Sequence, residues 1–114
     1  MKLFGIKTCD TCRKALKTLE GAGKSVTFMD LRSGDLTGDD MDRWLAALGW
    51  EALLNRRSTS WRALDEADKQ NLDETNARSL MLTNPTLIKR PVIETEDTIF
   101  VGFGKAQQDA LLKS

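Results

Sequence analysis

The sequence contains no histidine, only two cysteines and no long apolar run, and each of these shortages excludes a class of function. Two thiolates without an imidazole cannot complete the usual four-ligand zinc set, so we predict no metal site. No apolar run approaches the roughly 18 residues that a membrane helix needs, and no basic-then-apolar leader precedes the first predicted strand. We therefore expect a cytoplasmic protein that does not enter membranes.

A net charge is also missing, because 17 basic residues balance 17 acidic ones. A neutral chain has no overall field that attracts nucleic acid, so we predict no direct nucleic-acid contact and only local binding of anions. Hydrophobic residues make up 40% of the 114 residues and charged residues 30%, which is typical of globular proteins. We predict one domain over residues 1–114.

Both cysteines occur in the opening stretch of the chain. Residues 3–6 form an apolar run of strand length, and apolar residues then recur with helical spacing from Cys12 onward. Cys9 and Cys12 therefore belong to the first turn of a helix, where unpaired backbone N–H groups and the helix dipole stabilise an anion. Lys7 and Arg13 add positive charge. We predict a pKa of Cys9 below the ordinary thiol value of about 8.5, and a more buried, less reactive Cys12.

The remaining pattern predicts an α/β fold. Residues 25–30 read as a strand parallel to the first, joined to it by a right-handed crossover through the helix. A helical insert follows at about residues 37–88. Within it, Thr37 and Asp40 resemble a capping box, and Trp61, Leu64 and Ala67 are expected on one helix.

The chain closes with a predicted hairpin and a last helix. Residues 91–95 and 98–102 read as antiparallel strands joined by a tight turn, and residues 105–113 as a helix. The order βαβ, insert, ββα predicts a thioredoxin-like fold with a mixed sheet. A C-x-x-C between the first strand and its helix suits redox chemistry in such a fold. Cys9 is then the nucleophile, whereas Cys12 is either a second redox thiol or an ordinary core residue.

Basic residues elsewhere have a functional and a plain interpretation. Pro91 is either a simple strand opener or a cis-proline lying against the cysteines, in which case Arg90 presents its guanidinium to a carboxylate or oxyanion. Arg56 and Arg57 are either surface charges or contribute one side chain to the site. The three tryptophans are expected to serve in helix packing.

Three segments together carry a family resemblance: residues 8–15 around the cysteines, residues 53–57 with the paired arginines, and residues 84–92 around Arg90 and Pro91. They resemble the glutaredoxin-linked arsenate reductase (ArsC) family, which also includes the Spx regulators and the YffB-type proteins, with the YffB-type branch most similar. The resemblance implies a thioredoxin-like fold, a nucleophilic Cys9, and cationic residues that bind an anionic substrate or glutathione. The residues predicted to bind are Lys7, Thr8, Arg13, Arg56, Arg57 and Pro91, with Cys9, Cys12 and Arg90 catalytic.

The chain departs from the arsenate reductases at two places. It has Asn55 where they carry an arginine after paired leucines, and residues 102–105 read Gly-Phe-Gly-Lys where they carry a further Arg-Pro. The predicted function is therefore a glutathione-dependent thiol-disulfide reductase, with no tightly bound cofactor and with glutathione as co-substrate. Its predicted partners are a protein or small-molecule disulfide and glutaredoxin. Arsenate reduction and a non-catalytic, Spx-like regulator that binds RNA polymerase stay open as alternatives.

Overall fold

The computed structural model describes residues 1–70 and 72–113, and its chain divides into two compact units. Residues 1–35 and 90–113 form the first unit, and Leu36–Lys89 forms the second. The single domain with an insert at about residues 37–88 stays a prediction. In the described part of the chain, no helix combines the length and the apolar character needed to cross a membrane.

The first unit is built on a four-stranded sheet in the order β2-β1-β3-β4. Strand β1 (Lys2–Gly5) pairs in parallel with β2 (Thr27–Asp30), and β3 (Val92–Glu94) runs antiparallel to both β1 and β4 (Ile99–Val101). A parallel pair needs a crossover, which the helix between β1 and β2 supplies. The mixed sheet confirms the predicted α/β, thioredoxin-like fold class.

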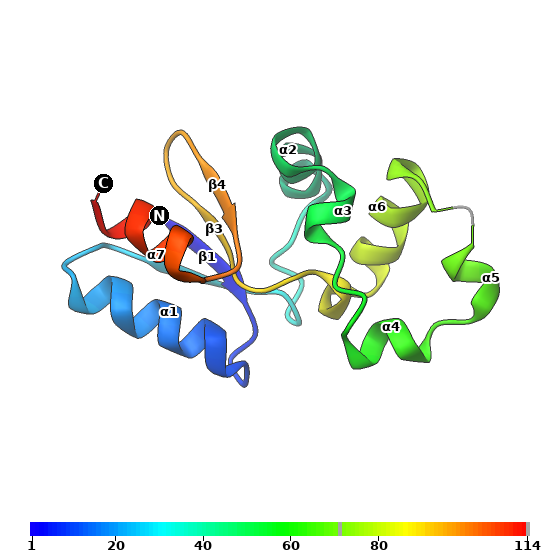
Figure 1. Cartoon of the computed structure of the whole chain (residues 1–114), viewed down its shortest axis with the longest axis horizontal. Coiled ribbons are helices and arrows are strands. Elements are labelled where there is room, and N and C mark those ends of the chain that lie inside the picture. The colour runs from blue at the N-terminus through cyan, green and yellow to red at the C-terminus, as the bar shows by residue number, and fades with distance from the viewer. Residues whose placement is uncertain (71, 114) are drawn as a thin grey trace. The chain divides into compact units, whose positions relative to one another are not determined.

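Two helices of the first unit, α1 (Asp10–Gly21) and α7 (Lys105–Lys113), pack on one face of this sheet (Figure 1). The apolar stripe of α1 recurs every three or four residues, so its buried side chains all meet the sheet. The core between the helices and the sheet consists of Leu3, Cys12, Ala15, Leu19, Ile93, Phe103 and Leu111. The loop between β1 and α1 is therefore anchored by well-packed elements on both sides.

The second unit is helical: α2 (Gly38–Leu48), α3 (Trp50–Leu53), α4 (Thr59–Ala63), α5 (Glu66–Lys69), α6 (Glu74–Thr83) and the 3₁₀ turn η1 (Pro85–Leu87). Its predicted capping box is confirmed. The Thr37 hydroxyl accepts from the Asp40 N–H and the Asp40 carboxylate accepts from the Thr37 N–H, both at 3.1 Å. Helix α2 ends at Gly49, whose φ of 84° lies in the region that favours glycine.

The single helix expected to carry Trp61, Leu64 and Ala67 is wrong. Helix α4 ends at Ala63, and Leu64 has extended backbone angles. Asp65 is also extended and serves as the N-cap of α5. Aspartate is favoured at the start of a helix and disfavoured inside one. The helix is therefore interrupted here, although the apolar spacing alone predicts that it continues.

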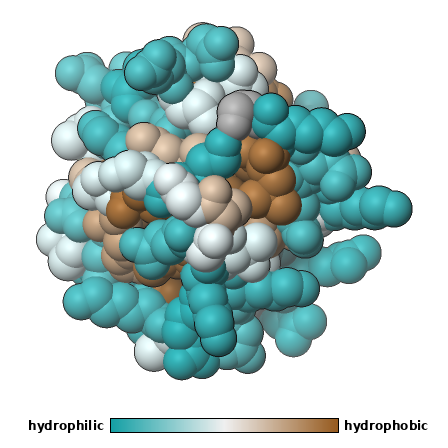
Figure 2. Space-filling model, turned by 90° about the vertical axis from the view of Figure 1, so that its left-hand side faces the viewer, coloured by the Kyte–Doolittle hydropathy of each residue, from teal (hydrophilic) through white to brown (hydrophobic). Residues whose placement is uncertain are grey.

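Hydrophilic residues dominate the face of the molecule in Figure 2, and hydrophobic residues show mainly near the middle of that view. Among the described residues, the large hydrophobic side chain that stands out as exposed is Leu112, at 40%. This surface is consistent with the balanced charge of the sequence.

Candidate active site

Cys9 lies at the junction between β1 and α1, as its N-cap residue. Its N–H donates to the Ile6 carbonyl at 3.0 Å, which closes the turn through Lys7 and Thr8. Its own carbonyl accepts from the Arg13 N–H at 3.0 Å and so begins the helix. The side chain of Cys9 is half-buried and packs against the core of the first unit. The predicted position at the first turn of a helix is confirmed.

Cys12 lies one turn further on and is completely buried, with 0% exposure. Its sulfur fills the space beside Gly5 at the end of β1. A Cβ added to Gly5 would stand 2.5 Å from the Cys12 sulfur and 3.0 Å from its Cβ. Only glycine at position 5 leaves room for this thiol, a requirement that the sequence prediction did not include.

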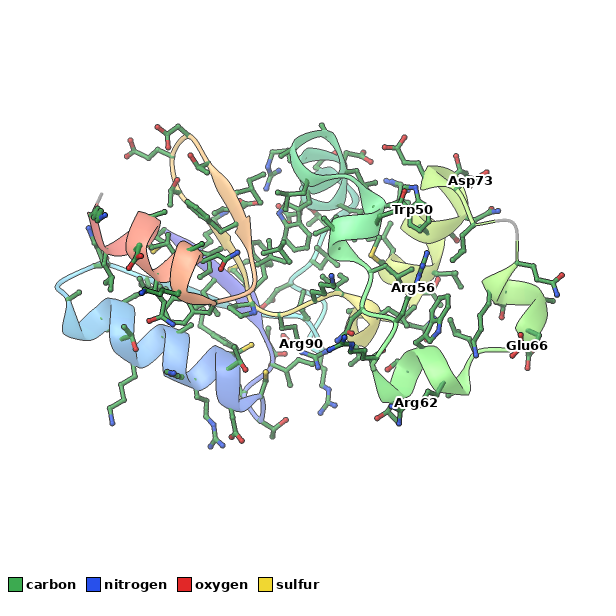
Figure 3. All side chains as sticks on the ribbon, in the orientation of Figure 1. Trp50, Arg56, Arg62, Glu66, Asp73 and Arg90 are labelled. Carbon is green, nitrogen blue, oxygen red and sulfur yellow. The ribbon has the colours of Figure 1, made fainter. Side chains whose placement is uncertain are left out.

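Arg90 and Pro91 enter the first unit directly before β3 (Figure 3). The peptide bond between them is cis, as one interpretation of the sequence anticipated. The Pro91 carbonyl accepts from the Gly102 N–H at 2.8 Å, which fixes the start of the strand. Because β3 lies beside β1, this segment brings the half-buried Arg90 side chain into the electrostatic environment of Cys9.

The pKa of the Cys9 thiol lies below its ordinary value. Partial burial alone would raise this pKa, but the backbone N–H and the thiol of Cys12, together with the guanidinium and the charge of Arg90, lower it. The Cys9 side chain makes no capping hydrogen bond to the helix, so the Cys12 N–H acts on the sulfur as a nearby dipole. The predicted lowering of the Cys9 pKa thus depends mainly on Cys12 and Arg90.

The pKa of the Cys12 thiol is shifted in the opposite direction, above its ordinary value. Burial, followed by the neighbouring Cys9, raises the pKa of its thiol to about 12, against a lowering by a hydrogen bond with the Ile6 backbone and by the charge of Arg90. A thiol of this pKa keeps its proton at neutral pH. Cys9 is therefore the more acidic of the two thiols, and neither cysteine is in a disulfide.

The other basic residues predicted near Cys9 are more exposed. Lys7 and Thr8 form the turn before Cys9, and both are exposed. Arg13 is exposed as well, and it pairs with Asp10 at 2.6 Å. This ion pair offsets part of the Arg13 charge, and the three-residue spacing on a helix could have indicated it.

Arg56 and Arg57 belong to the second unit, and their proposed role in substrate binding stays a prediction. The Arg56 guanidinium lies over the rings of Trp50 and Trp61, 5.8 and 5.9 Å from their centroids (Figure 3). Lys69 lies over the Trp61 ring at 5.5 Å. These contacts join the short helices α3, α4 and α5, so both tryptophans serve in helix packing as expected.

Metal-binding groups do not gather in the part of the chain that the structure describes: no cluster of three or more cysteine, aspartate or glutamate side chains has a suitable arrangement. The chemistry that the site offers comes from the Cys9 sulfur, whose pKa is lowered beside Arg90. A thiolate in this setting can attack a disulfide sulfur or another electrophile.

The fold and the position of Cys9 define a thioredoxin-like α/β protein. Residues 4–111 of the sequence, which is nearly the whole chain, match the ArsC family. The chain belongs to the ArsC family. This confirms the resemblance inferred from the three sequence segments.

Two solved structures and one curated relative are also similar to this chain. A structure of a protein named YFFB matches with a TM-score of 0.91 and 41% identity and covers 97% of both chains. An arsenate reductase (ArsC) related protein from Brucella melitensis matches with a TM-score of 0.76 and 42% identity, over 99% of this chain and 94% of that one. The global transcriptional regulator Spx of Staphylococcus saprophyticus is 29% identical over 105 residues, which is 90% of this chain and 79% of the regulator.

Proposed function

We propose that this protein is a glutathione-dependent thiol-disulfide reductase with Cys9 as its nucleophile. The observation that carries the proposal is the half-buried Cys9 sulfur, whose pKa is lowered although burial opposes it, by hydrogen bonds from Cys12 and by Arg90. A lowered pKa increases the fraction of Cys9 that is thiolate at a given pH, and thiol-disulfide exchange proceeds through the thiolate.

The reaction consists of two exchanges that balance in atoms and electrons. The Cys9 thiolate attacks the glutathione sulfur of a mixed disulfide, which forms a Cys9–glutathione disulfide and releases the substrate thiolate to take a proton from water. A second glutathione thiolate attacks this sulfur, forms oxidised glutathione and returns Cys9 as a thiolate. In the net reaction one glutathione thiol is consumed, the substrate is released as a thiol, and the disulfide bond passes to oxidised glutathione.

Glutathione carries two carboxylates, so cationic and polar groups near Cys9 are the proposed binding residues. Arg90 is the main candidate because its charge already acts on Cys9. Lys7, Thr8, Arg13 and the backbone of Pro91 complete the proposed set in the first unit. Arg56 and Arg57 belong to the second unit, and their part in binding stays a prediction from the sequence; the Arg56 side chain stacks on two indole rings.

Replacing the nucleophile tests this proposal. The wild-type protein should reduce a glutathione mixed disulfide in an assay coupled to glutathione reductase, and it should form one glutathione adduct after treatment with oxidised glutathione. The isosteric Cys9→Ser variant should lose the adduct and retain less than about 1% of the activity, because a serine hydroxyl is a far weaker nucleophile than a thiolate. Undiminished activity of Cys9→Ser, or an inactive wild-type protein, would contradict the proposal.

Arsenate reduction is a second candidate, favoured by the similarity to the ArsC-related protein from Brucella melitensis. Cys9 would then attack arsenic(V), with Arg90 beside the oxyanion. The departures at Asn55 and at residues 102–105 weigh against it. Turnover of arsenate coupled to glutathione and glutaredoxin measures this activity, and we expect little or none.

A regulator that binds RNA polymerase is the candidate from a different class, favoured by the 29% identity to Spx. In that case oxidation of the cysteine pair would control binding rather than catalysis. Retention of RNA polymerase on the immobilised protein would support this role, and we expect the polymerase to pass through.

A further inference from the structure

The two edges of the sheet in the first unit differ in how their backbone groups are used. Strands β2 and β4 are the edge strands. At the β2 edge, the Asp30 N–H donates to the Asp35 carboxylate at 2.8 Å, and the Asp30 carbonyl accepts from the Ser33 N–H at 3.3 Å. The loop after β2 thus blocks part of that edge, which is one way in which proteins prevent further strand pairing.

The edge of β4 is not blocked in this way. The Gly102 N–H donates to the Pro91 carbonyl at 2.8 Å, which directs residue 102 toward β3. Hydrogen-bonded and non-hydrogen-bonded pairs alternate along an antiparallel ladder, so the N–H and C=O groups of Ile99 and Val101 point away from β3. Within residues 1–70 and 72–113, these outward groups make no hydrogen bond. The strand also contains neither a lysine nor a proline, which often protect such an edge.

We propose that a second copy of this chain docks on this edge, so that two β4 strands pair antiparallel about a two-fold axis at Phe100. In this register, Ile99 of each copy stands opposite Val101 of the other, and both pairs exchange backbone hydrogen bonds. The contact is self-complementary, as a two-fold interface requires. The inference does not depend on the proposed function, because it uses none of the residues assigned to the Cys9 site.

The charges at the two ends of β4 favour a second copy as the occupant. Glu96 and Asp97 form an exposed acidic turn before the strand, and Lys105 is exposed just after it, at the start of α7. In antiparallel pairing, the acidic turn of each copy comes beside Lys105 of the other. Opposite charges then meet at both ends of the paired strands, where like charges would oppose the pairing.

The short strand makes this a weak, reversible dimer, because three residues bury far less surface than a stable interface needs. We expect a dissociation constant on the order of 0.1 mM. Sedimentation velocity of the wild type between roughly 10 µM and 1 mM at low salt should show the average mass rising from 12.7 kDa toward twice that value. A mass that stays at 12.7 kDa throughout would overturn the inference and leave this edge to an extended segment of another protein.

Two charge reversals test the register. Lys105→Glu and Glu96→Lys each bring like charges together at both ends of a homodimer, so each variant alone should dimerise about tenfold more weakly. In an equimolar mixture of the two variants, opposite charges meet again at both ends of the mixed dimer. The mixture should therefore associate about as strongly as the wild type, a recovery that a folding defect cannot produce. A mixture that associates no better than its separate components would overturn the inference.

Lys113→Glu is the matched control for these variants. Lys113 is an exposed lysine at the other end of α7, away from the proposed contact, so its reversal should leave dimerisation unchanged. If Lys113→Glu weakens association as much as Lys105→Glu does, net charge rather than this register controls association, and the inference fails.

Val101→Pro tests the backbone contact itself. The outward Val101 N–H makes no bond within the sheet, so proline removes a donor of the dimer without removing one from the ladder. This variant should keep its circular dichroism spectrum and remain at 12.7 kDa at about 1 mM. Dimerisation of folded Val101→Pro at the wild-type strength would overturn the inference. The mixture of charge variants decides the question even if the proline variant does not fold.

Discussion

Cys9 and Cys12 are the same residue type three positions apart, and the fold gives them opposite acid strengths. Cys9 stands at the helix start within reach of Arg90, so its thiolate is favoured. Cys12 stands in the core, so its thiol is favoured. Reactivity in this family member is therefore decided by burial and by two neighbours rather than by the C-x-x-C motif alone.

Gly5 provides a prediction at the scale of one residue. Gly5→Ala places a methyl group 2.5 Å from the Cys12 sulfur, so that sulfur must move. We expect a loss of about 1–3 kcal/mol in the free energy of unfolding, the usual cost of overpacking a core, and slower alkylation of Cys9. Urea unfolding and the alkylation rate measure the two effects.

Gly21 is the matched control for this substitution. It lies at the end of α1 with no atom close to the position of an added Cβ. Gly21→Ala should be neutral or stabilising by up to about 1 kcal/mol, because alanine favours a helix. If both alanine variants unfold alike, Gly5 is not needed to seat Cys12.

Part of the site could be predicted at this scale and part could not. The position of Cys9 follows from strand and helix periodicity, whereas its lowered pKa depends on Cys12 and on Arg90, which comes from a distant part of the sequence. The need for glycine at position 5 depends on the meeting of β1 with Cys12 in three dimensions, which no local pattern contains. The ion pair between Asp10 and Arg13, in contrast, could have been predicted from their three-residue spacing on a helix.

At the scale of elements, the second unit contains helices too short to be stable alone. Helices α3 and α5 have four residues each and α4 has five. Isolated helices of this length do not persist in water. The stack of Arg56 and Lys69 on two indole rings is therefore an organising contact of this region.

Arg56→Ala should lower the free energy of unfolding by about 1–2 kcal/mol, the sum of two cation–π contacts at an exposed site. Arg57→Ala is the matched control, because Arg57 is an exposed neighbour of the same charge, and we expect a change within about 0.5 kcal/mol. Denaturant unfolding followed by tryptophan fluorescence reports both. A larger effect at Arg57 than at Arg56 would contradict the structural role of the stack.

The capping box of α2 gives a second prediction for an element. Burial opposes ionisation of Asp40, but hydrogen bonds from Arg43 and Thr37 lower the pKa of its carboxyl overall. Asp40→Ala should cost about 1–2 kcal/mol at neutral pH. The carboxylate contributes stability above its ordinary pKa and loses it as pH falls through the folded-state value, so the difference from wild type should shrink in acid.

The exposed neighbour Asp39 is the control for this experiment. Asp39→Ala removes a negative charge from the first turn of α2 without touching the capping box, so we expect a cost of less than about 1 kcal/mol. Urea unfolding at neutral and acidic pH compares the two variants. A cost for Asp40→Ala that does not depend on pH would show that its charge is not involved.

The same scale shows what periodicity can and cannot predict. The helices α1 and α7, the hairpin and the start of α2 were predicted from the sequence, because their apolar spacing, alternation or capping residues are local patterns. The break between α4 and α5 was not, because Leu64 continues the apolar stripe although Leu64 and Asp65 both have extended backbone angles. The hydrophobic pattern alone does not show this break.

For the whole molecule, the balance of 17 basic and 17 acidic residues leads to a prediction about partners. Without a net positive charge there are few counterions to release from a nucleic acid. We expect no shift of a DNA duplex in a gel at physiological salt. Salt-dependent binding at micromolar protein would contradict this and would favour a regulatory role.

The central claim is that Cys9 is held as a thiolate by Arg90 and Cys12, and the titration of Cys9 tests it most directly. Thiolate absorbance against pH should give a Cys9 midpoint below the ordinary thiol value in the wild type, with the rate of alkylation falling as pH drops through it. Arg90→Ala should raise the midpoint, and Arg90→Lys, which keeps the charge, should raise it less. A wild-type midpoint at or above the ordinary value, unchanged in Arg90→Ala, would contradict the account.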